Sequence, residues 1–390
     1  MSDLTKCLKC GLPETYETIE YDQKGVCNIC HSATYKQEGV DWSARKTMLD
    51  GIVENFRGKG DYDCIVPFSG GKDSTFQLYY LCTEYKLKPL VVRFNHGFLR
   101  PTIQENTERV LKALGADFIE FTPNWTIVKR VMREAFERKG DFCWHCHCGI
   151  YSYPLRLAVK FQVPLVIWGE PIAEITAYYD YKRDEIEYED EEKFNMFRNL
   201  GISADDMYGM INSPESPVDR RDLLPYTYPT PADLRSINCT SICLGSFIPW
   251  DYTKNTALIK EKLGWKSDEL EGVPEELHGS GEKMECFIQG ARDYTKFLKR
   301  GYSRISQLMA FDIRNGRMTL EEALKYYALE GRRPPSLDLV LEYMAMSEAE
   351  FNGVTRGAEV SPHHHDYSRS ECADKTWDFD QWYREDNRKR

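Results

Sequence analysis

The stretch of residues 64–78 constrains the fold of this chain more than any other. Apolar residues around Pro67 predict the end of a buried strand, and the apolar spacing over residues 73–81 predicts a helix. The loop between them, residues 69–72, contains two adjacent glycines. Glycines let a backbone adopt positive φ and approach an anion closely, and the free N–H groups at a helix start supply donors. The stretch therefore predicts a phosphate-binding loop.

The loop and the first helical turn spell Ser-Gly-Gly-Lys-Asp-Ser. The candidate phosphate-binding residues are Ser69, Gly70, Gly71, Lys72, Asp73 and Ser74. The serine hydroxyls add hydrogen-bond donors, and the lysine adds a point charge. The P-loop pattern of kinases and GTPases is absent, which disfavours those classes. The alternative is a tight glycine turn that binds no phosphate.

Charge and composition limit the partners of the chain. It has 390 residues, and 51 Lys and Arg against 62 Asp and Glu give a net charge of −11. Nucleic-acid binders usually carry a basic face, so we expect no nucleic-acid partner. An apolar run of about 18 residues and a signal-peptide pattern are both missing, so we expect a cytoplasmic protein without a membrane segment.

Four N-terminal cysteines form the first metal-site candidate. Cys7, Cys10, Cys27 and Cys30 follow the pattern C-x2-C-x16-C-x2-C. This spacing lies within the window of four-thiolate zinc sites, and four ligands leave no open position for redox or catalytic chemistry. We therefore predict a structural Zn²⁺ ion. So short a segment cannot build a core of its own, so the metal is expected to fold it.

Apolar strands alternate with helices after this segment. The predicted strands are residues 88–95, 117–121 and 163–170, and the predicted helices are 102–114, 125–139 and 151–161. This alternation predicts an α/β fold with a doubly wound parallel sheet, and residues 247–252 are taken as a further strand end. From residue 256 onward the sequence pattern predicts helices. A capping box at Thr319 predicts the start of one of them, over residues 320–329. We expect an N-terminal zinc ribbon over 1–41, an α/β domain over 42–255 and a helical C-terminal region over 256–390.

Polar side chains follow two of the predicted strands. Arg93 and Asn95 end the second strand, and Glu170 ends the strand of 163–170. Ligands of doubly wound folds bind at the carboxyl ends of the strands. A carboxylate at the position of Glu170 could orient magnesium or take a proton from an amine, and we treat it as catalytic. His96 is either a site residue or a satisfied loop histidine.

A second cysteine cluster lies in the segment Cys143-Trp-His-Cys146-His-Cys148. With Cys243, these side chains could hold a second metal or an iron–sulfur cluster. Reduced cysteines that pack beneath the site are the alternative. Spacing alone does not choose between them.

The hexapeptide resembles the pyrophosphate loop of the ATP pyrophosphatase superfamily, whose α/β domain is HUP-like. The ensemble is more specific: the cysteine knuckles, the loop, residues 93–97, the segment from Cys143 and Trp168-Gly169-Glu170 together resemble the N-acetyl sugar amidotransferase family of bacterial surface-glycan pathways, including lipopolysaccharide and O-antigen. The resemblance extends over nearly the whole chain.

The resemblance implies an ATP-dependent ligase that forms AMP and pyrophosphate. It would convert the acetamido group of an N-acetylated, nucleotide-activated sugar to acetamidino through an O-adenylyl imidate. Lys72 and Asp73 would be catalytic, with Mg²⁺ near Asp73, and Arg93 and Asn95 would contact the adenosine of ATP. Ammonia would come from a separate glutaminase, together with a barrel-type companion that channels it, because the chain lacks a glutaminase nucleophile.

Two rival functions share some of these features. A sulfurtransferase that acts on tRNA also combines zinc knuckles, this loop and a cysteine trio, but the acidic net charge of −11 argues against it. A nucleotide-binding scaffold without turnover is the second alternative. The intact Lys72 and Asp73 disfavour that reading.

Overall fold

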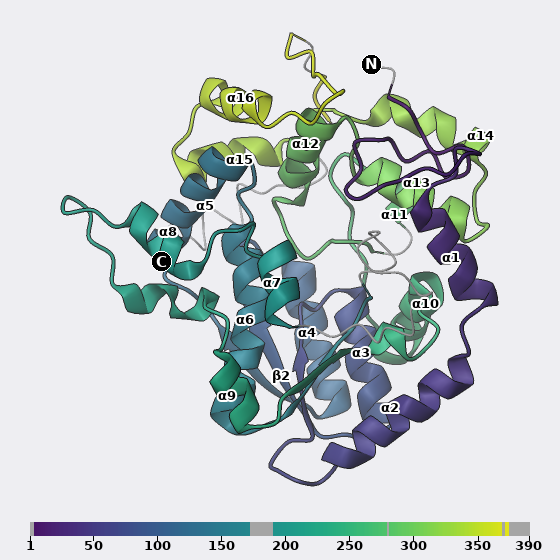
Figure 1. Ribbon diagram of the computed structural model, residues 1–390, viewed down its shortest axis with the longest axis vertical. Helices are drawn as coiled ribbons and strands as arrows, with labels where there is room; N and C mark the ends of the chain where they lie inside the picture. Colours follow the sequence, from purple (N-terminus) through teal and green to yellow (C-terminus); the bar gives the residue numbers. More distant parts are fainter. Residues whose placement is uncertain (1–3, 172–189, 279–280, 369–370, 374–390) are drawn as a thin grey trace. The chain divides into compact units, whose positions relative to one another are not determined.

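The computed structural model describes residues 4–171, 190–278, 281–368 and 371–373 (Figure 1). The chain divides into two compact units. One contains residues 41–171 and 190–266, and the other contains residues 4–40, 267–278, 281–368 and 371–373. In the described part, no helix is both long and apolar enough to cross a bilayer.

The first unit is an α/β unit. Its elements are α2 (Trp42–Phe56), β1 (Cys64–Pro67), α3 (Lys72–Thr83), β2 (Pro89–Phe94), α4 (Pro101–Leu114), β3 (Asp117–Phe121), α5 (Trp125–Lys139), α6 (Trp144–Phe161), β4 (Leu165–Trp168), α7 (Glu191–Phe197), α8 (Ala204–Ile211), η2 (Arg220–Tyr226), α9 (Pro231–Ser236), β5 (Thr240–Cys243), η3 (Leu244–Ser246) and α10 (Tyr252–Leu263).

Its five strands form one parallel sheet in the order β3-β2-β1-β4-β5. Ile65 of β1 pairs with Leu90 of β2 and with Val166 of β4. These residues are buried, as a sheet covered by helices on both faces requires. The α/β class with a parallel, doubly wound sheet is therefore confirmed. The strand order reverses between β1 and β4, which makes this crevice the topological switch point.

The helices form two layers. Helices α3, α4 and α10 pack on one another, whereas α5, α6 and α8 form a separate group, with α6 against β1, β2 and β4 (Figure 1). Right-handed crossovers run from β1 towards β3 and then back through β4 to β5, so these two groups cover opposite faces of the sheet. The ligand site is therefore expected at the carboxyl ends of β1 and β4, between the two groups of helices.

Two sequence-based element assignments differ from the structure. Helix α6 begins at Trp144 rather than at residue 151, so the second cysteine segment forms its first turns. Residues 247–252 do not form a strand: the fifth strand is β5, and Asp251 caps α10 by accepting hydrogen bonds from the N–H groups of Thr253 and Lys254. The predicted strand at 117–121 and the predicted helix at 125–139 are confirmed.

The second unit joins the two ends of the sequence. Its elements are α1 (Asn28–Glu38), α11 (Glu275–His278), α12 (Gln289–Arg300), α13 (Arg304–Arg314), α14 (Leu320–Ala323), η4 (Leu324–Leu329), α15 (Ser336–Met344) and α16 (Glu348–Gly357). The capping box at Thr319 is confirmed, because its hydroxyl accepts from the Glu322 N–H and the Glu322 carboxylate accepts from the Thr319 N–H.

The four N-terminal cysteines pack directly on this helical unit. They share one buried cluster with Tyr302 and with Ala310 of α13, and α1 also packs on α13. The segment that was expected to depend on metal alone thus has a helical surface beneath it. The boundaries of 1–41, 42–255 and 256–390 remain a prediction about independent domains.

Candidate functional site

The loop after β1 has the geometry of a phosphate cradle. Gly70 has a φ of +84°, and Gly71 is the N-cap of α3 and has no side-chain cap. The backbone N–H groups of Ser69 and Gly70 each donate to the Ser74 hydroxyl at 3.2 Å, and the Gly71 N–H donates to the Ser69 hydroxyl at 3.2 Å. Three consecutive amides thus point at the loop's own hydroxyls, which phosphate oxygens could replace.

The next two residues bring opposite charges to the start of α3. The Lys72 ammonium is 3% exposed and lies 2.5 Å from the Asp73 carboxylate. The other carboxylate oxygen, Asp73 Oδ1, is buried and has no hydrogen-bond partner among the described residues. A buried carboxylate oxygen without a donor is a fitting ligand for a divalent cation such as Mg²⁺.

Residues beyond β5 complete the loop. The Trp265 indole N–H donates to the Gly70 carbonyl at 3.0 Å, and Trp265 is 2% exposed. Lys72 lies over the ring of Tyr252 at 5.4 Å from its centroid. Sequence reasoning missed Trp265, because no motif includes it. The only signal was its place just after α10, which ends at Gly264.

A substitution at Gly70 tests whether the loop needs its positive-φ backbone conformation. A Cβ there would lie 2.8 Å from Thr107 Oγ1 and 2.9 Å from Ile103 Cγ2, in a conformation with positive φ. Gly70→Ala should therefore cost more than the roughly 1–2 kcal/mol of a left-handed alanine, and should weaken ATP binding. Gly58→Ala is the matched control, because its φ is +69° but nothing lies within 4 Å of its Cβ. Urea unfolding and nucleotide titration compare the two, and equal losses would refute the steric argument.

The side chains of Arg93, near the end of β2, and Asn95, just after it, both donate to Glu120 of the neighbouring strand β3. Arg93 donates to the Glu120 carboxylate at 2.5 Å and to the Thr107 hydroxyl at 2.7 Å. Asn95 Nδ2 donates to Glu120 at 3.3 Å, and its oxygen accepts from the Gly97 N–H at 2.9 Å. Burial lowers the pKa of Arg93, while Glu120 counteracts this shift. Contact of either side chain with ATP remains a prediction.

His96 is a buried loop residue. Its Nδ1 accepts from the Phe98 N–H at 3.3 Å. Burial, with smaller contributions from His145 and Arg93, lowers its pKa to about 3. The ring is neutral at physiological pH, which fits the structural reading left open by the sequence better than a proton-transfer role.

Glu170 follows β4 and lies at the other side of the switch point, half-buried after Gly169. A Cβ at Gly169 would lie 3.4 Å from the Asp73 carbonyl oxygen and 3.1 Å from Gln77 Oε1. The chain after β4 therefore passes directly beside the first turn of α3. This places Glu170 near the phosphate loop in the fold, and its catalytic role stays a prediction.

The second cysteine segment is not assembled as a metal site. Cys143 caps α6, Cys146 and Cys148 lie in its first turns, and the Cys243 thiol donates to the Gly169 carbonyl at 3.2 Å. The described residues contain one group of three or more metal-type ligands within 4.8 Å of one another, and these cysteines are not in it. Their predicted second metal or iron–sulfur cluster has no support from this geometry.

The four N-terminal cysteines do come together as a candidate metal site. Cys7, Cys10, Cys27 and Cys30 have ligand atoms all within 4.8 Å of one another and are at most 1% exposed. The Sγ atoms of Cys7 and Cys30 are 4.0 Å apart, and those of Cys10 and Cys27 are 3.7 Å apart. Four Zn–S bonds of about 2.3 Å in a tetrahedron space the sulfurs by about 3.8 Å. The donor set therefore fits Zn²⁺.

Electrostatics also favour a cation between these sulfurs. Hydrogen bonds from Cys10, Cys27 and Cys30 lower the pKa of Cys7, and the same kind of contact with Cys10, Cys27 and Cys7 raises the pKa of Cys30. Backbone N–H groups of Cys10 and Cys27 donate to the Cys7 sulfur at 3.5 and 3.3 Å. Four thiolates cannot share this buried space without a positive ion among them.

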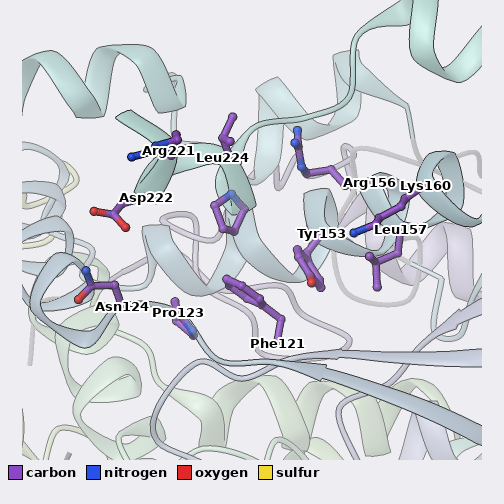
Figure 2. Close-up of a pocket in the computed structure, with 11 residues that line it drawn as sticks. Phe121, Pro123, Asn124, Tyr153, Arg156, Leu157, Lys160, Arg221, Asp222 and Leu224 are labelled. Atoms are coloured by element: carbon purple, nitrogen blue, oxygen red, sulfur yellow. The ribbon is translucent and has the colours of Figure 1, made fainter. Parts of the chain in front are cut away.

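A separate cavity of about 470 Å³ lies in the α/β unit, on the side of α5 and α6 (Figure 2). Phe121 and Tyr153 stack at 4.5 Å between ring centroids and form one wall. Figure 2 shows Arg156 and Lys160 of α6 on one side and Arg221 and Asp222 of η2 on the other. The cavity lies on the face opposite α3 and α4, so it is not the crevice of the phosphate loop.

The match to a known protein family lies in the helical unit. Residues 282–383 match the family described as LPS biosynthesis protein WbpG-like, C-terminal domain. Residues 282–383, the WbpG-like domain, are similar to the C-terminal domain of that family. This match supports the resemblance to the N-acetyl sugar amidotransferase family. The WbpG-like domain contains α12 to α16, including the helix α13 on which the cysteine cluster packs.

Two further proteins are similar to this chain. The uncharacterized protein MJ1599 of Methanocaldococcus jannaschii is 25% identical over 221 residues, which are 52% of this chain and 76% of that protein. Among solved structures, the U34-tRNA thiolase NcsA from Methanococcus maripaludis, with its 4Fe–4S cluster, is 16% identical with a TM-score of 0.31, over 89% of this chain and 95% of that one. A likeness at that score does not bear on function.

Proposed function

We propose that the chain is an ATP-dependent amidotransferase of lipopolysaccharide biosynthesis. Its substrate would be a nucleotide-activated, N-acetylated sugar, whose acetamido group becomes acetamidino. The match of residues 282–383 to the WbpG-like domain carries the choice of pathway. The phosphate cradle between β1 and α3 supports the choice of reaction, because it offers amides, hydroxyls and an ammonium to a leaving pyrophosphate.

The reaction makes a poor leaving group into a good one. The acetamido carbonyl oxygen attacks the α-phosphorus of ATP, the bond from that phosphorus to the bridging oxygen breaks, and pyrophosphate leaves. Ammonia then adds to the carbon of the O-adenylyl imidate, the carbon–oxygen bond breaks, and AMP departs with the former acetamido oxygen. The surplus proton passes to a base or to water. The former acetamido oxygen thus ends as an oxygen of the AMP phosphate.

Named side chains would serve these steps. The Gly70 and Gly71 amides would hold the departing phosphates, and Lys72 would offset the negative charge that develops on them. Asp73 Oδ1 would hold Mg²⁺, which neutralises phosphate charge when bound. Trp265 would keep the Gly70 peptide in position through its carbonyl. Glu170 would take the proton that ammonia loses.

Ammonia would come from a separate glutaminase subunit with a barrel-type companion. This part of the proposal follows from the family resemblance. The described structure contains no assigned surface for either partner, so the first test replaces both with an ammonium salt. Pulldown with the candidate glutaminase would address the partners afterwards.

The test is pyrophosphate release from ATP. The purified chain is mixed with ammonium salt and, in turn, with several nucleotide-activated N-acetylated sugars. We expect release that depends on one acetamido sugar and yields an acetamidino product by mass spectrometry. Release without any sugar, or none with any acetamido sugar, would contradict the proposal. A parallel reaction with tRNA and a sulfur donor covers the sulfurtransferase alternative, and thiolated tRNA would decide in its favour.

A further inference from the structure

Arg314 ends helix α13 as a buried cation. It is 9% exposed, and its Nη1 atom is buried without a hydrogen-bond partner among the described residues. Burial lowers the pKa of its guanidinium, whereas Cys10, Tyr16, Cys30 and Cys27 raise this pKa, and none of these four groups is a carboxylate. A buried guanidinium without an anion is costly, because it loses its hydration. The Phe311 ring, whose centroid lies 5.7 Å from the Arg314 Cζ, offsets only a small part of this cost.

The packing of α13 places this cation beside the cysteine cluster. Ala310 lies one turn before Arg314 on the same face of α13, is fully buried, and belongs to the same cluster as the four cysteines. Helix α1 closes the other side, where the Gln37 amide donates to the Arg314 carbonyl at 3.3 Å.

Metal binding would supply the missing anion. One Zn²⁺ ion with four thiolates carries two net negative charges, and this charge is buried with the cysteines. We propose that Arg314 is the counter-ion of the zinc tetrathiolate, so that zinc binding by the N-terminal knuckles stabilises the WbpG-like domain through this residue. The metal-free protein then contains a cation without a partner, whereas the zinc-loaded protein contains a buried ion pair.

If Arg314 pairs with the zinc tetrathiolate, its replacement should change the unfolding temperature in opposite directions with and without zinc. Arg314→Met keeps much of the side-chain volume and removes the charge. In zinc-loaded full-length protein, we expect it to lower the unfolding temperature and to weaken zinc binding by about 10- to 100-fold. After removal of zinc by a chelator, we expect the same variant to unfold at a higher temperature than the wild type, because the unpaired buried charge is gone.

Two variants separate charge from packing. Arg314→Lys keeps the charge and should retain most of the zinc affinity. Arg317→Met changes a neighbouring arginine that is paired with Asp312 at 2.9 Å and should leave zinc affinity unchanged. Zinc retention against a competing chelator and thermal unfolding with and without zinc give both readouts, and neither depends on ATP turnover.

A ligand exchange provides a second measurement if metal-free Arg314→Met aggregates. Cys27→His replaces one thiolate by a neutral imidazole and removes one negative charge from the site. In that background, the loss of zinc affinity caused by Arg314→Met should become smaller. Equal losses for Arg314→Lys and Arg314→Met, an unchanged loss in the Cys27→His background, or a variant that is less stable both with and without zinc would show a packing role and overturn the proposal.

Discussion

Lys72→Ala is expected to reduce pyrophosphate release from ATP by about 100- to 1,000-fold, the usual loss when one preorganised group at a developing charge is removed. The side chain is 3% exposed and pairs with Asp73 at the first turn of α3, so its ammonium is held beside the loop where the phosphate charge would develop. Initial rates of sugar-dependent pyrophosphate release at saturating ATP measure the effect.

The control for this variant is Lys262→Ala in α10 of the same unit. Lys262 is 48% exposed, and its ion-pair partner among the described residues is its neighbour Glu261. Its removal should leave the rate unchanged. Circular dichroism and thermal unfolding should show that Lys72→Ala keeps its fold. A Lys72→Ala protein that retains most of the wild-type rate would show that the loop does not hold the reacting phosphates.

Cys7→Ser is expected to have the largest effect on folding. Its sulfur accepts backbone N–H groups of Cys10 and Cys27 and lies within the buried cluster of four sulfurs. Structural zinc sites contribute about 10–16 kcal/mol in small zinc domains, so the loss of one ligand removes much of this energy. We expect zinc content to fall from near one ion per chain, with loss of soluble protein.

Cys372→Ser serves as the matched control, because this thiol is exposed and lies in the same unit. It should keep both zinc and solubility. Metal content is measured by atomic emission on protein that passes gel filtration. If Cys7→Ser kept its zinc and its yield, the four cysteines would not form the site.

The phosphate loop could be predicted from sequence because its signals are local. A buried strand, two glycines and a helix with correct apolar spacing lie within residues 64–78, and the structure has β1, the loop and α3 in that order. The zinc set could be predicted for the same reason, since its two knuckles each close within four residues. Such sites are predictable because residues close in sequence define their geometry, without knowledge of the tertiary packing.

Other features depend on packing that no local pattern encodes. Pro154 and Gly149 discourage a helix at the second cysteine segment, yet the burial of Trp144 extends α6 to that point. Arg93 and Asn95 appear free at a strand end in the sequence, and only the register of β2 with β3 reveals Glu120 beside them. Contacts of this kind require knowledge of which strands are neighbours.

Two long-range contacts show the same limit. Trp265 reaches Gly70 across 195 positions of sequence, and Arg314 comes to the N-terminal cysteines only because the two ends of the chain form one unit. Trp265 belongs to no recognisable motif. Their roles follow from burial and from the polar atoms that they face.

The fate of the acetamido oxygen tests the central claim most directly. A nucleotide-activated sugar whose acetamido group contains heavy oxygen is incubated with ATP, ammonium salt and the protein, and the nucleotide products are analysed by mass spectrometry. Adenylyl transfer to the amide predicts that the label appears in the phosphate of AMP. Label that remains in the sugar while AMP forms, or formation of ADP instead of AMP, would contradict it.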